Sequence, residues 1–202
     1  MVNDRPADGF TAARRAMIDS QLRVSGVNEE AVLTAINGVA REAHVPAEAQ
    51  ALAYIDRAVP LGEGRFLAAP LFYGRMLSEA GARADDRILV VDGGSGYLPA
   101  LARKFSAAVD VVDSAAAASG TDASTGADGY TLLLIDGVIE ELPAGLASRL
   151  ADDGRVVTGL VERGVTRLAY GRKAGGEVAL LALAEMGIPL LPEFAKPKGW
   201  SF

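Results

Sequence analysis

The sequence predicts an α/β fold built around a largely parallel sheet. An apolar strand at 87–91 runs directly into the glycine-rich turn DGGSGY and then into the helical segment LPALARKF. From Arg87 onward, strand patterns alternate with helix patterns, which is the order that parallel strands and their crossover helices require. With 202 residues, half of them apolar, the chain is long enough to bury the core of one such domain.

Residues 1–80 are expected to form a helical extension that packs on the α/β domain of residues 81–202, so that the chain is one compact unit. In the extension, apolar residues recur at helical spacing. We expect helices over 11–24, from a cap at Asn28, from Pro46 to Leu52 and from Pro70 to Ala80, with a turn-rich connector over 54–64.

The α/β domain continues the strand–helix alternation to its end. We expect strands at 109–112, 131–135 and 155–161, a helix at 144–150, and a closing β-hairpin of 165–170 and 178–183 around the turn RKAGGE. The tail that starts IPLLPEF is expected to lie along the surface. The segment 114–130 is almost entirely Ala, Gly, Ser, Thr and Asp, which predicts a flexible surface loop with one short helix and no strand.

The glycine-rich turn is the strongest functional signal in the chain. Glycines at 93, 94 and 96 permit positive φ and leave backbone N–H groups bare, which is how α/β sheets present themselves to a nucleoside ligand. Asp113 ends the second strand, 17 positions after Gly96, where an acid reaches the two hydroxyls of a ribose. The pattern predicts a nucleoside cofactor pocket, and the alternative is that the glycines only close the turn.

The composition argues against several kinds of site. The net charge is −6 and the 20 Lys and Arg residues are scattered, which disfavours nucleic acid as a partner. The absence of cysteine excludes disulfides and thiolate ligands, and a single histidine leaves no His-rich zinc site. No segment has the roughly 18 apolar residues of a membrane span, and MVNDRPADGF lacks the apolar run of a secretory signal. We expect a cytoplasmic protein that holds no metal and binds neither nucleic acid nor membrane.

Several separate motifs, in order along the chain, resemble one known family. They are MIDSQLR, AREAHVP, AYIDRAVPLGEGRFLAAP, VVDGGSGY and LLPEF. Together they resemble the protein-L-isoaspartate O-methyltransferases, and a divergent bacterial branch of that family in particular. The resemblance implies a doubly wound, Rossmann-like methyltransferase sheet that ends in an antiparallel hairpin. It also implies S-adenosylmethionine as cofactor and isoaspartyl-containing proteins or peptides as substrates.

The resemblance also assigns expected roles to residues of the glycine loop. The expected cofactor-binding residues are Asp92, Gly93, Gly94, Ser95, Gly96 and Asp113. Gly94 and Gly96 would lie under the methionine portion of the cofactor, and Asp113 stands where the family carries its ribose-binding acid. Asp92 has two open interpretations: it accepts the ammonium group of the cofactor, or it caps the helix that begins at Tyr97.

The chain departs from the family pattern at three places. Ala68 stands where the family has a serine at its isoaspartyl site, and for this reason no catalytic residue is assigned. The residues expected on the substrate side are Ala68 and Pro70. Val90 and Asp92 replace an acid and a glycine of the family's first strand. The segment 114–130 replaces a helix, a strand and the wall over the adenine, so the third strand is expected to be missing from the edge of the sheet.

Two functions from different classes therefore stay open. The first is an S-adenosylmethionine-dependent protein-L-isoaspartate O-methyltransferase, or a degenerate member of that family with weakened or lost cofactor binding. The second is a non-catalytic, methyltransferase-like scaffold that binds a partner or forms a homodimer through its N-terminal helices. A nicotinamide-dependent oxidoreductase fits poorly, because Asp92 would put a negative charge where a pyrophosphate must sit.

Overall fold

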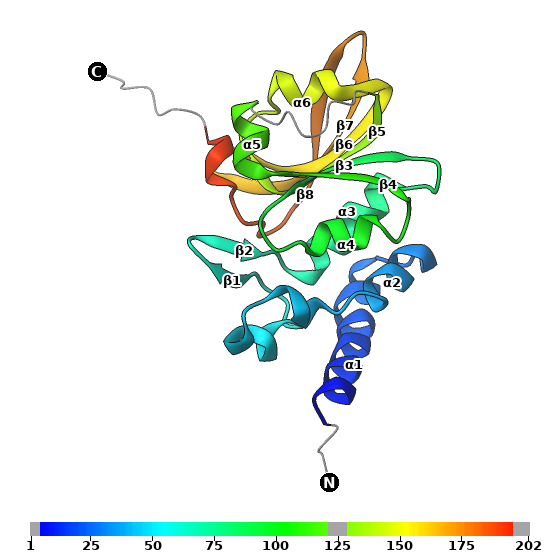
Figure 1. Ribbon diagram of the computed structural model, residues 1–202, viewed down its shortest axis with the longest axis vertical. Helices are drawn as coiled ribbons and strands as arrows, with labels where there is room; N and C mark the ends of the chain where they lie inside the picture. The colour runs from blue at the N-terminus through cyan, green and yellow to red at the C-terminus, as the bar shows by residue number, and fades with distance from the viewer. Residues whose placement is uncertain (1–4, 121–128, 196–202) are drawn as a thin grey trace, which may run out of the picture.

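The computed structural model describes residues 5–120 and 129–195, and its centre is a six-stranded sheet (Figure 1). The strand order is β4-β3-β5-β6-β7-β8. Strands β4, β3, β5 and β6 run parallel to one another, whereas β7 pairs antiparallel with both β6 and β8. The bounds are β3 Arg87–Asp92, β4 Ala108–Asp113, β5 Tyr130–Ile139, β6 Leu150–Glu162, β7 Val165–Ala174 and β8 Glu177–Glu185. The largely parallel sheet with a closing hairpin is confirmed.

Helices cover both faces of this sheet, which confirms the doubly wound arrangement (Figure 1). Successive side chains of β3 point to opposite faces, as a strand requires. Ile88 and Val90 join the core formed with the N-terminal helices, α3 and α4, while Leu89 and Val91 join the core beneath α5 and α6. The bounds are α3 Pro70–Ala80, α4 Tyr97–Ala102, α5 Ser114–Ser119 and α6 Ala144–Arg149.

The N-terminal region packs on the same core but differs in detail from expectation. The helix expected over 11–24 consists of α1 Arg5–Met17, a π-helical turn Ile18–Leu22 and a 3₁₀ turn Arg23–Ser25. The cap at Asn28 is wrong, because α2 Glu30–Asn37 has Glu29 at its N-cap position, with no side-chain cap bond. Two 3₁₀ turns follow, Arg41–His44 and Ala47–Leu52, the second preceded by Pro46 as expected.

The connector expected over 54–64 forms part of a small hairpin. Strand β1 Val59–Gly62 pairs antiparallel with β2 Arg65–Leu67, and Gly62, Glu63 and Gly64 all have positive φ at the turn. Such short strands carry no alternation that a sequence pattern would reveal. The hairpin leads directly into α3 and stands beside the glycine loop.

The segment after β4 begins with a helix. Asp113 accepts hydrogen bonds from the N–H groups of Ala115 and Ala116 and thereby caps α5. Among the described residues β4 is the edge of the sheet, as expected for a missing third strand. The expected loop over 121–128 lies outside the described residues.

The described part of the tail does not lie along the surface as expected, because it completes the core; residues 196–202 lie outside the described residues. Ile188, Leu191 and Phe194 are buried, and Leu191 donates its N–H to the carbonyl of Val138. The physical reason is that β5 continues to Ile139, with its pairing to β6 interrupted between Leu134 and Val138. The tail fills the space that this interruption leaves. No described helix has both the length and the hydropathy needed to span a bilayer.

Candidate functional site

The glycine loop joins the carboxyl end of β3 to the start of α4. The carboxylate of Asp92 accepts the N–H of Gly96 with both oxygens, at 3.0 and 3.2 Å. Gly94 and Gly96 have φ of 103° and 68°, which only glycine adopts readily. Asp92 therefore fastens the turn from inside. Its carboxylate bonds to Gly96, the N-cap residue of α4, and burial is the main reason that its pKa is raised.

Gly93 is required by a close approach between the loop and β5. A Cβ atom at this position would lie 2.6 Å from the backbone oxygen of Asp136. Asp136 and Gly137 form the interruption in the β5–β6 pairing, and a Cβ at Gly137 would lie 2.7 Å from Cγ of Leu191 in the tail. The loop, the interrupted strand and the tail are therefore packed backbone to backbone at the carboxyl edge of the sheet.

Asp136 is buried beneath this loop. Its Oδ1 accepts the hydroxyl of Tyr73 at 2.8 Å, and its Oδ2 lies 3.5 Å from Oγ of Ser95. Burial raises the pKa of Asp136 to about 7; the bond from Tyr73 lowers that pKa and the charge of Asp92 raises it. The carboxyl therefore lies under the ligand-binding edge of the sheet rather than on it.

Arg41 is a fully buried cation that the sequence interpretation did not single out. Its guanidinium stacks near the rings of Tyr73 and Tyr97, 5.5 and 5.1 Å from their centroids. It donates to the carbonyls of Ala53, at 2.5 Å, and Ala68. The N–H of Ala68 donates to the hydroxyl of Tyr73 at 3.3 Å. The backbone at Ala68 is thus tied through Tyr73 to Asp136, while its own side chain is buried.

Arg65 crosses the outer side of the glycine loop. Its stem lies against Gly94, where a Cβ would be 2.9 Å from Cδ of Arg65. Its guanidinium donates to Oε1 of Glu193 at 2.6 Å, to Oγ of Ser114 at 2.9 Å and to the carbonyl of Gly93 at 3.4 Å. Neither Arg65 nor Glu193 was predicted as a site residue, because they are 128 positions apart and only the folded chain brings their two motifs together.

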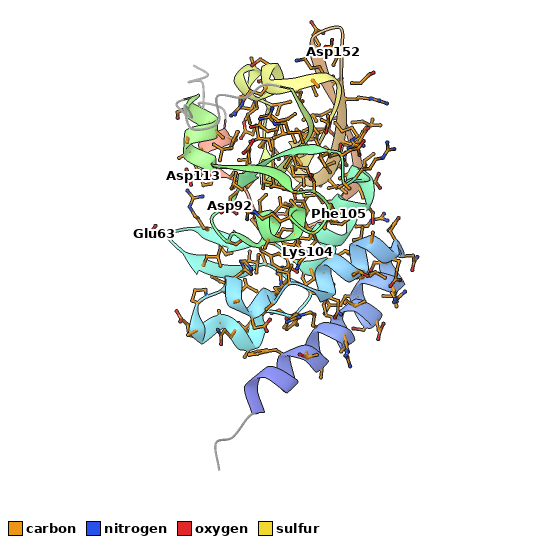
Figure 2. All side chains as sticks on the ribbon, turned by 45° about the vertical axis from the view of Figure 1, so that its right-hand side comes forward. Glu63, Asp92, Lys104, Phe105, Asp113 and Asp152 are labelled. Carbon is orange, nitrogen blue, oxygen red and sulfur yellow. The ribbon has the colours of Figure 1, made fainter. Side chains whose placement is uncertain are left out.

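Asp113 and Asp92 end adjacent parallel strands and are paired in register. Figure 2 shows both at the same end of the sheet, with Glu63 of the β1–β2 turn nearby and Asp152 at the opposite end. The Asp113 side chain is exposed, and its Oδ1 oxygen caps α5. The residues proposed from the sequence around the cofactor are thus gathered at one place, with Asp113 at its rim.

The remaining loop residues are held by short contacts. Oγ of Ser95 accepts the N–H of Tyr97 at 3.0 Å, and the Ser95 carbonyl lies 2.9 Å from Nδ1 of His44. The His44 ring meets the Tyr97 ring edge-on, with centroids 5.3 Å apart. His44 is half-buried and supports the loop through these contacts.

A cavity of about 760 Å³ opens between the β1–β2 hairpin, the start of α3 and the tail. Its walls come from three segments, around Arg57, around Phe66 and Phe72, and from Met186 to Pro192. Asp56 and Arg57 line it together with apolar side chains, including the exposed Leu190. Pro70 starts α3 directly after Ala69, which lines the cavity. The cavity is suited to an extended, partly apolar ligand.

The loop and the cavity share two walls. On the β1–β2 hairpin, Arg65 turns to the loop while its neighbours Gly64 and Phe66 line the cavity. On the tail, Glu193 accepts from Arg65 while its neighbour Pro192 lines the cavity. Ligands held in the two places would therefore be neighbours, one on each side of the hairpin and the tail.

Comparisons with known proteins agree on one family. A family model described as protein-L-isoaspartate(D-aspartate) O-methyltransferase matches residues 12–118. The protein-L-isoaspartate O-methyltransferase of Methanoculleus marisnigri is 29% identical to this chain, and the alignment covers 96% of each. That of Methylorubrum populi is 31% identical over 72% of this chain and 78% of its own length.

The fold is shared with solved structures. A protein described as a protein-L-isoaspartate O-methyltransferase from Plasmodium falciparum, in complex with S-adenosyl-L-homocysteine, matches with a TM-score of 0.71. The match covers 89% of this chain and 98% of that one at 16% identity. A second structure titled protein-L-isoaspartate O-methyltransferase matches with a TM-score of 0.68 at 14% identity, over 88% of this chain and 65% of that one. At these identities the likeness concerns the fold.

Proposed function

Because the chain belongs to the protein-L-isoaspartate O-methyltransferase family, we propose that it uses S-adenosylmethionine to methylate the free carboxyl group of isoaspartyl residues in proteins and peptides. Members of this family act on isoaspartyl-containing proteins and use this cofactor. The observation that carries the proposal is the pair of walls shared by the glycine loop and the cavity. These walls would hold a methyl donor at the loop close to a carboxylate at the rim of the cavity, and alignment is what the reaction most needs.

The residues around the loop fit a methyl donor of this kind. Gly94 is exposed and its positive φ leaves bare backbone at the surface of the turn. Under the proposal, the turn from Gly93 to Gly96, including Ser95, underlies the amino-acid portion of the cofactor. Asp92 keeps that turn closed and adds negative charge beneath a ligand that carries ammonium and sulfonium groups. The exposed carboxylate of Asp113 would accept the ribose hydroxyls.

The substrate side of the proposal rests on the cavity and on the segment that starts α3. Ala68 and Pro70 stand in this segment, and Ala69 lines the cavity. An isoaspartyl carboxylate has a reference pKa of about 4, so it is ionised at neutral pH and needs no general base. Arg57 lines the same cavity and supplies positive charge for a carboxylate at its rim.

The chemistry proposed is a direct transfer between the two ligands. Bound S-adenosylmethionine supplies a methyl group on a positively charged sulfur. One oxygen of the substrate carboxylate forms the new bond to carbon as the carbon–sulfur bond breaks, leaving a methyl ester and S-adenosylhomocysteine. The protein's own contribution is to orient the carboxylate and to exclude water between the hairpin and the tail.

The direct test is transfer of labelled methyl groups from S-adenosylmethionine to an isoaspartyl peptide, with the normal aspartyl peptide as control. Transfer to the isoaspartyl peptide alone supports the proposal. The Asp113→Asn variant should bind the cofactor roughly ten- to a hundredfold more weakly, since a hydrogen bond to a charged group is lost. The matched control is Asp152→Asn at the opposite end of the sheet. Cofactor binding without transfer would favour the non-catalytic scaffold.

Three expectations from the sequence complete the proposal. The first is a cytoplasmic location, tested by fractionation of cells that make the protein. The second is a homodimer formed through the N-terminal helices, tested by sedimentation equilibrium. The third is that residues 1–80 and 81–202 unfold together as one compact unit, which calorimetry would register as a single transition.

A further inference from the structure

The titratable side chains that face the glycine loop are mostly acidic. Asp92 lies inside the turn, Asp136 lies beneath it and Asp113 stands at its rim. Arg65 is the cation whose guanidinium donates to the carbonyl of Gly93 and whose stem covers Gly94. An amino-acid ligand could therefore place its ammonium group near these acidic side chains and its carboxylate near Arg65.

The present partner of Arg65 is incompletely satisfied. Glu193 accepts from the guanidinium through Oε1 only, while its Oε2 is buried and has no hydrogen-bond partner among the described residues. A carboxylate oxygen left in this state is costly, because it has lost water and gained no donor. Both side chains are about one quarter exposed, at 28% and 22%, so the pair is within reach of a ligand from solvent.

The other contacts of Arg65 hold it in place without Glu193. Ser114 accepts from the same nitrogen that reaches Gly93, and this leaves the second terminal nitrogen for Glu193. The guanidinium is therefore held over the loop by Ser114 and by the carbonyl of Gly93. Its second terminal nitrogen points to the carboxylate of Glu193.

We propose that Arg65 binds the carboxylate of the cofactor's amino-acid portion, and that Glu193 occupies this place until the cofactor displaces it. The inference rests on the proposed function, since it assumes a cofactor with an amino-acid portion at the glycine loop. It adds a residue that recognises the cofactor and a competing carboxylate within the same chain. Displacement of Glu193 also releases the tail from its ion pair with the hairpin.

Calorimetric titration tests the inference with two compounds. S-adenosylhomocysteine carries the carboxylate, and decarboxylated S-adenosylmethionine lacks it. The Arg65→Gln variant should bind S-adenosylhomocysteine roughly ten- to a hundredfold more weakly than the unchanged protein, and the decarboxylated compound about equally well. The affinity of the Arg65→Lys variant for S-adenosylhomocysteine should lie between those of the unchanged protein and Arg65→Gln, because lysine keeps the charge but loses the planar guanidinium. The Glu193→Gln variant should bind S-adenosylhomocysteine more tightly.

A control variant and two contrary results complete the test. Arg103→Gln changes an exposed arginine at the far end of α4 and should leave both affinities unaltered. Equal loss of both compounds in Arg65→Gln, or tighter binding of S-adenosylhomocysteine, overturns the inference and makes the ion pair a simple latch. If the unchanged protein binds neither compound, the proposed function fails and the inference fails with it. Thermal unfolding of each variant establishes that it is folded.

Discussion

The buried carboxyl of Asp136 should make stability fall as pH rises toward neutrality, and the Asp136→Asn variant should remove that dependence. An aspartate in the unfolded chain titrates near its ordinary pKa of 3.8, whereas burial raises the pKa of Asp136 to about 7 in the folded protein. Between these two values the folded protein keeps a proton that the unfolded chain has lost. The stabilising effect is complete below about pH 4 and declines as pH rises through 7.

The magnitude follows from the difference between the two pKa values. Each unit corresponds to about 1.4 kcal/mol, so a difference of about three units amounts to roughly 4 kcal/mol between pH 4 and pH 7. An amide in place of the carboxyl does not titrate, and its oxygen still accepts the hydroxyl of Tyr73. The free-energy difference between the variant and the unchanged protein should therefore shift in favour of the variant by this amount over that range.

Urea titrations at half-unit intervals from pH 4 to pH 7.5 measure this difference. Comparing two proteins cancels the contribution of the other carboxylates, which both proteins share. Asp152→Asn, an exposed change far from the loop, is the matched control and should track the unchanged protein. Parallel free-energy curves for Asp136→Asn and the unchanged protein would refute the assignment of a raised pKa to Asp136.

Three further changes probe the packing and the site. Gly93→Ala should destabilise the fold by about 2 kcal/mol, because its Cβ would be 2.6 Å from the backbone oxygen of Asp136; an unaltered melting temperature would contradict this. Arg155→Met should cost about 3 kcal/mol at pH 7, since it strands the buried carboxylate of Asp86, which accepts from Arg155 at 2.6 Å with both oxygens. Burial opposes ionisation of Asp86, but its hydrogen bonds and the charge of Arg155 lower its pKa overall. The loss of stability in Arg155→Met should therefore become smaller in acid. A loss that urea titrations show to be independent of pH would disprove the pairing. Ala68→Ser should raise the rate of methyl transfer to an isoaspartyl peptide about tenfold by restoring an orienting hydroxyl; a lower melting temperature without faster transfer would count against it.

Elements with strong local signals were predicted well from the sequence. Helix α3 has the bounds expected, because Pro70 suits the first turn of a helix and Gly81 ends it in the left-handed conformation. The strand before the glycine loop and the closing hairpin were likewise visible as apolar runs bounded by turn residues. The β1–β2 hairpin was not predicted, because three or four residues per strand give no periodicity to detect.

The parts of the site that depend on distant contacts could not be predicted. Arg41 carries a charge, and only the folded chain supplies the carbonyls of Ala53 and Ala68 that allow it to be buried. Arg65 and Glu193 come together through the return of the tail, which no local pattern indicates. Asp92 illustrates the intermediate case: the sequence located it at the turn, but only the structure shows its bond to Gly96.

The return of the tail to the middle of the sheet has a consequence for biosynthesis. Residues 188–194 are made after the hairpin and the strand β5 that they contact, so a nascent chain that still lacks them has a glycine loop open on one side and a cavity without its last wall. Folding of the earlier strands can begin on the ribosome, but both ligand places are finished only after residues 188–194 have been made. Proteolytic trimming at the same point would undo both places at once.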